Sequence, residues 1–83
     1  MSERKAWGIL WRSNNALDGR REHLDGDPNH PCRTLLFDSR AEARRYNNER
    51  YGYIRTRPDL RAEPHGWEMP KVVRVLIRME IIG

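Results

Sequence analysis

The sequence predicts an α+β fold, in which one capped helix packs on a three- to four-stranded, mostly antiparallel sheet. Two segments near the ends of the chain alternate between apolar and other residues with the period of a strand. Between them lies a stretch in which a capping box follows a short apolar strand. A chain of 83 residues supports only one compact core, so residues 1–83 are expected to form a single small domain.

The first half of the chain is expected to hold three strands. A strand is predicted at 6–12, with Trp7, Ile9 and Trp11 facing the helix and Ala6, Gly8 and Leu10 on the opposite face. The Asp18-Gly19 turn signal predicts that 20–24 folds back as a short polar strand. Two prolines and a glycine predict a loop at 25–31, and a third strand is predicted at 33–37.

The helix is expected at 40–51, since Ser39 and Glu42 stand at the spacing of a capping box. Gly52 is expected to end it in the left-handed conformation. Three groups of side chains follow from the helical period. Ala43, Tyr46 and Asn47 face the sheet, Glu42, Arg45 and Glu49 form a surface with expected ion pairs, and Arg40 and Arg44 share a third side without an acidic neighbour.

The clearest strand is predicted at 72–82, after an irregular stretch at 53–70 with at most one helical turn at 58–61. One alternate set of its residues is wholly apolar and is expected to face the helix: Val73, Val75, Ile77, Met79 and Ile81. The other set is expected on the face that a single helix leaves bare: Val72, Arg74, Leu76, Arg78, Glu80 and Ile82.

The net charge of +4 and a pI near 9.8 are compatible with an anionic partner. Most of the basic residues are arginines, and Lys5 and Lys71 are the only lysines. This preference for arginine also fits the codon bias of a GC-rich genome. Cys32 is the single cysteine, so no internal disulfide forms, and no apolar run approaches membrane-spanning length. We therefore expect a cytoplasmic protein that does not bind a membrane.

Six arginines with interleaved tyrosines form the main candidate site for a nucleic acid or another partner. Basic side chains bind phosphates with release of counterions, and aromatic rings stack on bases. The alternative is a solvated charged face in which nearby carboxylates neutralise several of the arginines. The candidate residues are Arg40, Arg44, Arg45, Arg55, Arg57 and Arg61.

A second candidate is the bare face of the last strand, represented by Val72, Arg74, Leu76 and Arg78. Apolar centres with charged neighbours are typical of a surface that meets another protein, and a two-fold homodimer is the commonest closed arrangement. The alternative is plain exposure to solvent, with arginine stems lying over the apolar side chains.

Catalytic and metal sites are not expected. His23, His30 and Cys32 lack the spacing of ordinary zinc ligands, so no metal or other cofactor is predicted. His65 lies near carboxylates and is the best candidate for a general base, but no nucleophile accompanies it. The sequence therefore favours a binding protein over an enzyme.

Four segments carry a resemblance to known proteins: 7–13 with Leu17-Asp18-Gly19, the joint at 37–44, 57–61, and 63–67. In these segments the chain resembles small proteins of unassigned function from bacteriophage and prophage genomes. The resemblance implies an accessory role in the cytoplasm of an infected or lysogenic bacterium. The leading hypothesis is a protein–protein interaction module, such as an inhibitor of a host defence system. The alternative is a nucleic-acid-binding accessory protein that uses its arginine-rich face.

Overall fold

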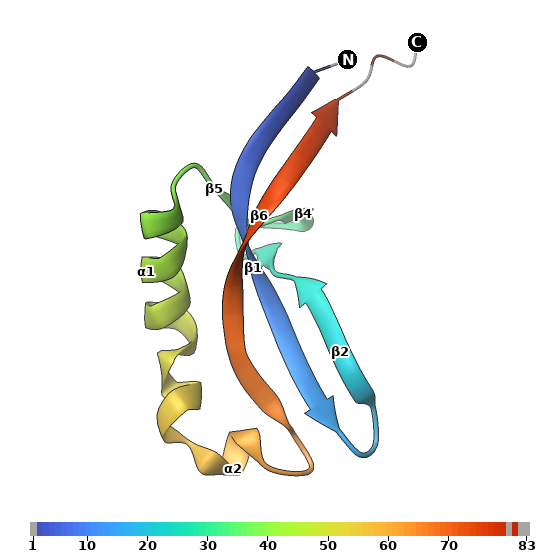
Figure 1. Ribbon diagram of the computed structural model, residues 1–83, viewed down its shortest axis with the longest axis vertical. Coiled ribbons are helices and arrows are strands. Elements are labelled where there is room, and N and C mark those ends of the chain that lie inside the picture. The colour runs from blue at the N-terminus through green and yellow to red at the C-terminus, as the bar shows by residue number, and fades with distance from the viewer. Residues whose placement is uncertain (1, 80, 82–83) are drawn as a thin grey trace.

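The computed structural model describes residues 2–79 and 81 and confirms an α+β fold, with the helices on one face of an antiparallel sheet (Figure 1). The ribbon formed by the first and last strands extends beyond the start of the long helix. The elements are β1 Ser2–Asn15, β2 Gly19–Leu24, β3 Gly26–Asp27, β4 His30–Thr34, β5 Leu36–Phe37, α1 Arg40–Tyr51, the 3-10 helix η1 Gly52–Thr56, α2 Pro58–Arg61 and β6 Trp67–Met79.

β1 is the central strand and is longer than predicted at both ends. β6 pairs with one of its edges in antiparallel register, from Ser2 opposite Met79 to Ser13 opposite Trp67. The other edge is shared by β2, which forms the predicted hairpin, and by the short β5. Residues 80 and 82 of the predicted last strand lie outside the described residues.

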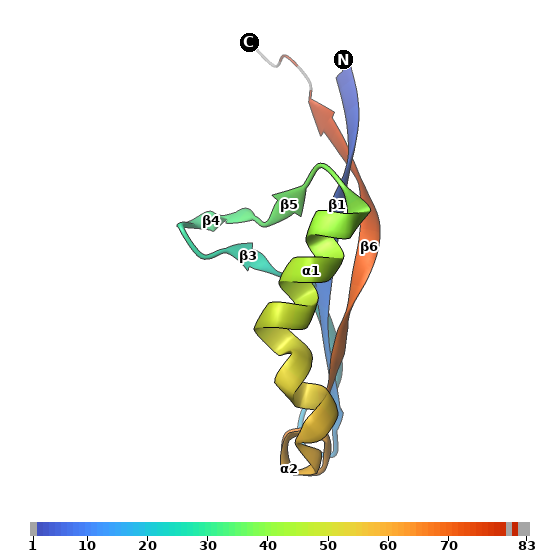
Figure 2. The ribbon, with the colours of Figure 1, turned by 90° about the vertical axis from the view of Figure 1, so that its left-hand side faces the viewer.

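The prediction of a loop at 25–31 is wrong, because β3 and β4 form a small hairpin there that projects from the main sheet (Figure 2). The predicted strand at 33–37 is broken at Leu35. Two backbone hydrogen bonds explain the break: the Asp25 amide donates to the Ile9 carbonyl at 2.8 Å, and the Leu35 amide donates to the Asp25 carbonyl at 2.9 Å. These bonds fix the base of the hairpin against β1.

The predicted orientation of the last strand is also wrong. Trp7 pairs with Arg74 and Ile9 pairs with Val72, and directly paired residues share a face of the sheet. Trp7 and Ile9 lie on the helix side as predicted, so Val72 and Arg74 lie there too. The apolar set of Val73, Val75 and Ile77 instead shares the opposite face with Ala6, Gly8 and Leu10. Met79 pairs with Ser2, also on that opposite face, and Ile81 lies beyond the strand.

A β-bulge interrupts β6, where two residues, Met69 and Pro70, stand opposite the single residue Trp11 of β1. A proline inside a strand is found at edges and bulges, since it cannot donate to the ladder. Side chains satisfy the two carbonyls that the bulge displaces. Arg12 Nη2 donates to the Met69 carbonyl at 2.8 Å, and Asn47 Nδ2 donates to the Pro70 carbonyl at 2.8 Å. The second bond ties α1 to β6.

A side-chain cap marks the start of α1, and a right-handed glycine at its end lets the chain continue into η1. The Glu42 amide donates to Ser39 Oγ at 3.1 Å, which confirms the predicted N-cap. The prediction for Gly52 is wrong: its φ of −57° is right-handed, so the chain runs on into η1. Ile54 of η1 is fully buried and Leu60 of α2 nearly so, which means that the stretch predicted as irregular contributes to the core.

The core is completed by small residues and an aromatic cluster. Ile9 and Ala43 are buried between β1 and α1, while Ala6 is buried on the opposite face of β1. Lower down the sheet, the Trp11 ring contacts Tyr51 and Trp67, with ring centroids 5.7 and 5.4 Å apart. These contacts hold the end of α1 and the start of β6 against β1.

The Tyr51 hydroxyl donates a hydrogen bond to the Asp25 carboxylate and so joins the end of α1 to the base of the β3–β4 hairpin. Burial of the phenol, together with this bond, raises the pKa of Tyr51 well above its ordinary value of 10.0. The folded state therefore holds the Tyr51 proton more tightly than the unfolded state does.

The stability contributed by this proton is complete below pH 10 and is lost as the pH rises through the higher pKa of the folded state. We expect the free energy of unfolding to fall as the pH rises above 10, and to fall less in Tyr51→Phe, which has no phenol to ionise. Guanidinium denaturation of both proteins on either side of pH 10 measures the difference. An equal alkaline loss in the variant would contradict the prediction.

Candidate functional site

A groove of about 460 Å³ runs between α1 and β6, and its lining is basic. Four cationic residues and two amides surround one apolar residue, and none of the described residues that line the groove carries a carboxylate. The lining residues are Arg40, Arg44, Asn47, Asn48, Arg55, Lys71 and Val72.

Each basic residue of the groove has an identifiable structural support. Arg40 and Arg44 stand one helical turn apart, on the side of α1 that faces β6. Arg55 lies on η1 next to the fully buried Ile54, which anchors that element. Lys71 directly follows the bulge of β6, where Asn47 binds the strand to the helix.

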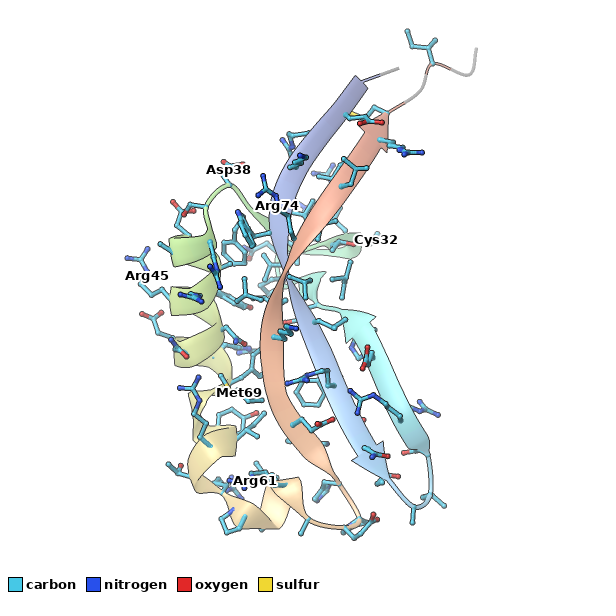
Figure 3. The ribbon with its side chains drawn as sticks, viewed as in Figure 1. Cys32, Asp38, Arg45, Arg61, Met69 and Arg74 are labelled. Atoms are coloured by element: carbon cyan, nitrogen blue, oxygen red, sulfur yellow. The ribbon has the colours of Figure 1, made fainter. Side chains whose placement is uncertain are left out.

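Arg74 adds a fifth cation beside the groove (Figure 3). Its guanidinium carbon lies 5.3 Å from the centroid of the Trp7 ring, and that of Arg40 lies 5.8 Å from the same ring. Guanidinium groups are attracted to the faces of aromatic rings, which here orients two arginines from different elements around one tryptophan. Arg40 and Arg74 therefore both lie beside the Trp7 ring.

The charge of this group is not compensated within the described part of the chain. The ion pairs of those residues involve Arg20, Arg21, Arg57 and Arg78, and none involves a cation of the groove or Arg74. Like charges held close together repel one another, and a bound anion relieves that repulsion. The groove is therefore a site that favours an anionic ligand.

The structure divides the six predicted arginines. Arg40, Arg44 and Arg55 lie together in the groove. Arg45 points away from the sheet (Figure 3), on a separate surface lined also by Glu42 and Glu49. The ion pairs predicted among these three residues do not form within the described part of the chain.

The other two predicted arginines are engaged locally. Arg57 Nη2 lies 2.7 Å from Asp59 Oδ2, and this bond lowers the pKa of the Asp59 carboxyl below its ordinary value. Arg61 Nη1 donates to the Arg55 carbonyl at 3.1 Å. Arg61 thus supports the backbone that carries a groove residue.

Sequence reasoning missed Lys71 and assigned Arg74 and Val72 to a different surface. The register between β1 and β6 places Val72 and Arg74 on the helix side, whereas Lys71 pairs with Leu10 and lines the groove next to the bulge. Leu76 and Arg78, also predicted on the bare face, pair with Lys5 and Glu3 and so share the helix-side face with Arg74, although both also line a separate apolar hollow.

The histidines and the cysteine lie apart from the groove. His23 contacts the Trp11 ring and His65 the Trp67 ring, while His30 and Cys32 are exposed on β4. Among residues 2–79 and 81, no three side chains of histidine, cysteine, aspartate or glutamate gather as a metal site would require.

No protein-family model, curated protein or solved structure matches this chain. The resemblance to small phage proteins therefore stays a prediction from the sequence. None of the helices in the described ranges has both the length and the apolar character needed to cross a bilayer. The chemistry of the groove is the strongest indication of function.

Proposed function

We propose that this protein binds the phosphate backbone of a nucleic acid in the groove between α1 and β6. The observation that carries the proposal is the gathering of Arg40, Arg44, Arg55 and Lys71 along a groove to which no described residue adds a carboxylate, with Arg74 beside it. Basic groups in this arrangement gain affinity for a phosphate polymer by displacing its condensed counterions. In a phage or prophage setting, such a protein is a non-enzymatic accessory factor.

The distance over which the basic residues of the groove extend favours a polymer over a single small anion. Arg40 starts α1 and Arg55 lies near the end of η1, so the two are about 20 Å apart at the rise of a helix. A nucleic acid presents several phosphates over that distance, whereas one phosphate reaches only one or two of the cations.

The groove contacts the backbone rather than the bases. Trp7 has two guanidinium groups near its ring, and the tyrosines that interleave with the arginines in the sequence do not line the groove. Tyr46 instead packs on Phe37 with ring centroids 5.3 Å apart. Backbone contacts carry no direct sequence information, so we expect binding without sequence preference.

Substitution of Arg44 tests the proposal. We expect Arg44→Ala to weaken binding several-fold for every sequence and to reduce the slope of log affinity against log salt by about 1. The matched control is Arg45→Ala, on the same helix but on the side with Glu42 and Glu49. Fluorescence anisotropy with labelled duplex and single-stranded oligonucleotides, titrated at several salt concentrations, measures both quantities.

Two results would overturn the proposal. One is the absence of salt-dependent binding by the unmutated protein to either kind of oligonucleotide. The other is an equal loss of affinity in Arg44→Ala and Arg45→Ala, which would place the contacts outside the groove. Circular dichroism of each variant shows whether α1 is retained.

A further inference from the structure

An apolar hollow of about 510 Å³ lies along β6, mainly on the face of the sheet opposite α1, where Val75 and Ile77 share a face with Leu36. Leu76 and Arg78 belong by register to the helix-side face and line its margin. Leucine, valine and isoleucine side chains form most of it, with two arginines and a threonine at its margin. The residues that line it are Leu24, Arg33, Thr34, Leu36, Val75, Leu76, Ile77 and Arg78.

The small residues of β1 explain where this hollow forms. Ala6 and Gly8 occupy the central strand between the walls contributed by β2 and β5 on one side and by β6 on the other. A Cβ atom on Gly8 would lie 3.1 Å from Val75 Cγ2 and 3.3 Å from Leu24 Cδ2. Both larger side chains therefore rest directly on the backbone of β1.

The hollow is open to solvent in the described part of the chain. Leu24 is 38% exposed, and Val75 and Ile77 are half-buried. An apolar surface of this kind, bordered by polar groups, is typical of an interaction site, because its burial releases ordered water.

We infer that the hollow binds an extended acidic segment of a partner protein, with an apolar side chain in the hollow and carboxylates on the marginal arginines. Arg33 forms no ion pair with a described residue. Arg78 Nε lies 3.3 Å from Glu3 Oε1, but both side chains are about half exposed or more, so this pair is weak and exchangeable.

Charge also decides between this partner and a second copy of the chain. A two-fold dimer through the hollow would bring Arg33 and Arg78 of both copies into one interface, and each copy carries a net charge of +4. Like charges across an interface oppose association, whereas a carboxylate-bearing segment is attracted to the same groups. The site is on the opposite face from the basic groove and does not depend on nucleic-acid binding.

Synthetic peptides provide a direct test. The probe is a short fluorescent peptide in which leucines alternate with glutamates, and the two controls replace its leucines with serines or its glutamates with lysines. We expect saturable binding of the probe alone, measured by anisotropy. We expect Arg33→Glu to weaken it about tenfold, and Ile77→Glu to weaken it at least as much, while Arg45→Glu leaves it unchanged.

The outcomes distinguish the occupants of the hollow. Equal binding of the probe and either control, or full affinity in both Arg33→Glu and Ile77→Glu, would overturn the proposal. Light scattering that shows a dimer of the unmutated protein and a monomer of Ile77→Glu would assign the hollow to a second copy instead. If Ile77→Glu fails to fold, Arg33→Glu with a folded far-ultraviolet circular dichroism spectrum provides the test alone.

Discussion

Gly66→Ala is expected to destabilise the fold by about 2 to 4 kcal/mol, because the added methyl group has no room and the backbone is strained. The φ of Gly66 is +62°, in the left-handed region that other residues rarely adopt. An ideal Cβ there would lie 2.0 Å from the carbonyl oxygen of Asn14, which is backbone and cannot rotate away. Chemical denaturation of both proteins measures the difference in stability.

The close approach at Gly66 also holds β1 to the turn before β6. The Asn14 amide donates to the Gly66 carbonyl at 2.8 Å, and Asn15 Nδ2 donates to the His65 carbonyl at 3.0 Å. Separating the two backbones would weaken both bonds.

Gly52→Ala is the matched control for this prediction. Gly52 has a right-handed φ and no atom within 4 Å of its ideal Cβ position, so alanine there should stabilise the protein by about 0.5 to 1 kcal/mol. Equal effects of the two substitutions would contradict the steric explanation.

Ile54→Ala is expected to cost about 2 to 5 kcal/mol, the range for truncating a fully buried isoleucine. Ile54 is 0% exposed and is the residue that fixes η1 against the sheet. The same loss should loosen Arg55 and Arg61, which sit on η1 and just beyond it. Denaturation measures the stability, and nucleic-acid titration of the folded fraction measures the effect on the groove.

Tyr53→Ala serves as the control on the same element, since Tyr53 is 44% exposed. Its cost should stay below about 1 kcal/mol, as for other surface positions. A larger loss at Tyr53 than at Ile54 would mean that η1 packs through its other side.

Local features were predicted well because short-range chemistry determines them. The Ser39 cap, the extent of α1 and the hairpin at Gly19 each follow from a few neighbouring residues. The inward face of β1 was also predicted, since Trp7, Ile9 and Trp11 are much larger than the residues between them.

The orientation of β6 depends on its pairing with β1 and could not be predicted from its own pattern. Both alternate sets of β6 contain apolar residues, and the more apolar set covers the face without a helix. As a result Val72 and Arg74 were predicted on the wrong face of the sheet, away from Arg40 and Arg44. Arg40, Arg44 and Arg55 were predicted as a basic group because they lie near one another in the sequence. The groove also needs β6, whose lining residues lie more than 20 residues beyond Arg44.

The bulge at Met69 and Pro70 also limits self-association of the protein. β6 pairs only with β1 in the described ranges, and an open edge of this length invites strands from other molecules. An added strand needs an unbroken row of backbone donors and acceptors. Pro70 has no N–H, and its carbonyl already accepts from Asn47. A ladder growing along β6 would therefore be interrupted at Pro70, the fourth of the thirteen residues of the strand, which opposes edge-to-edge growth through the start of β6.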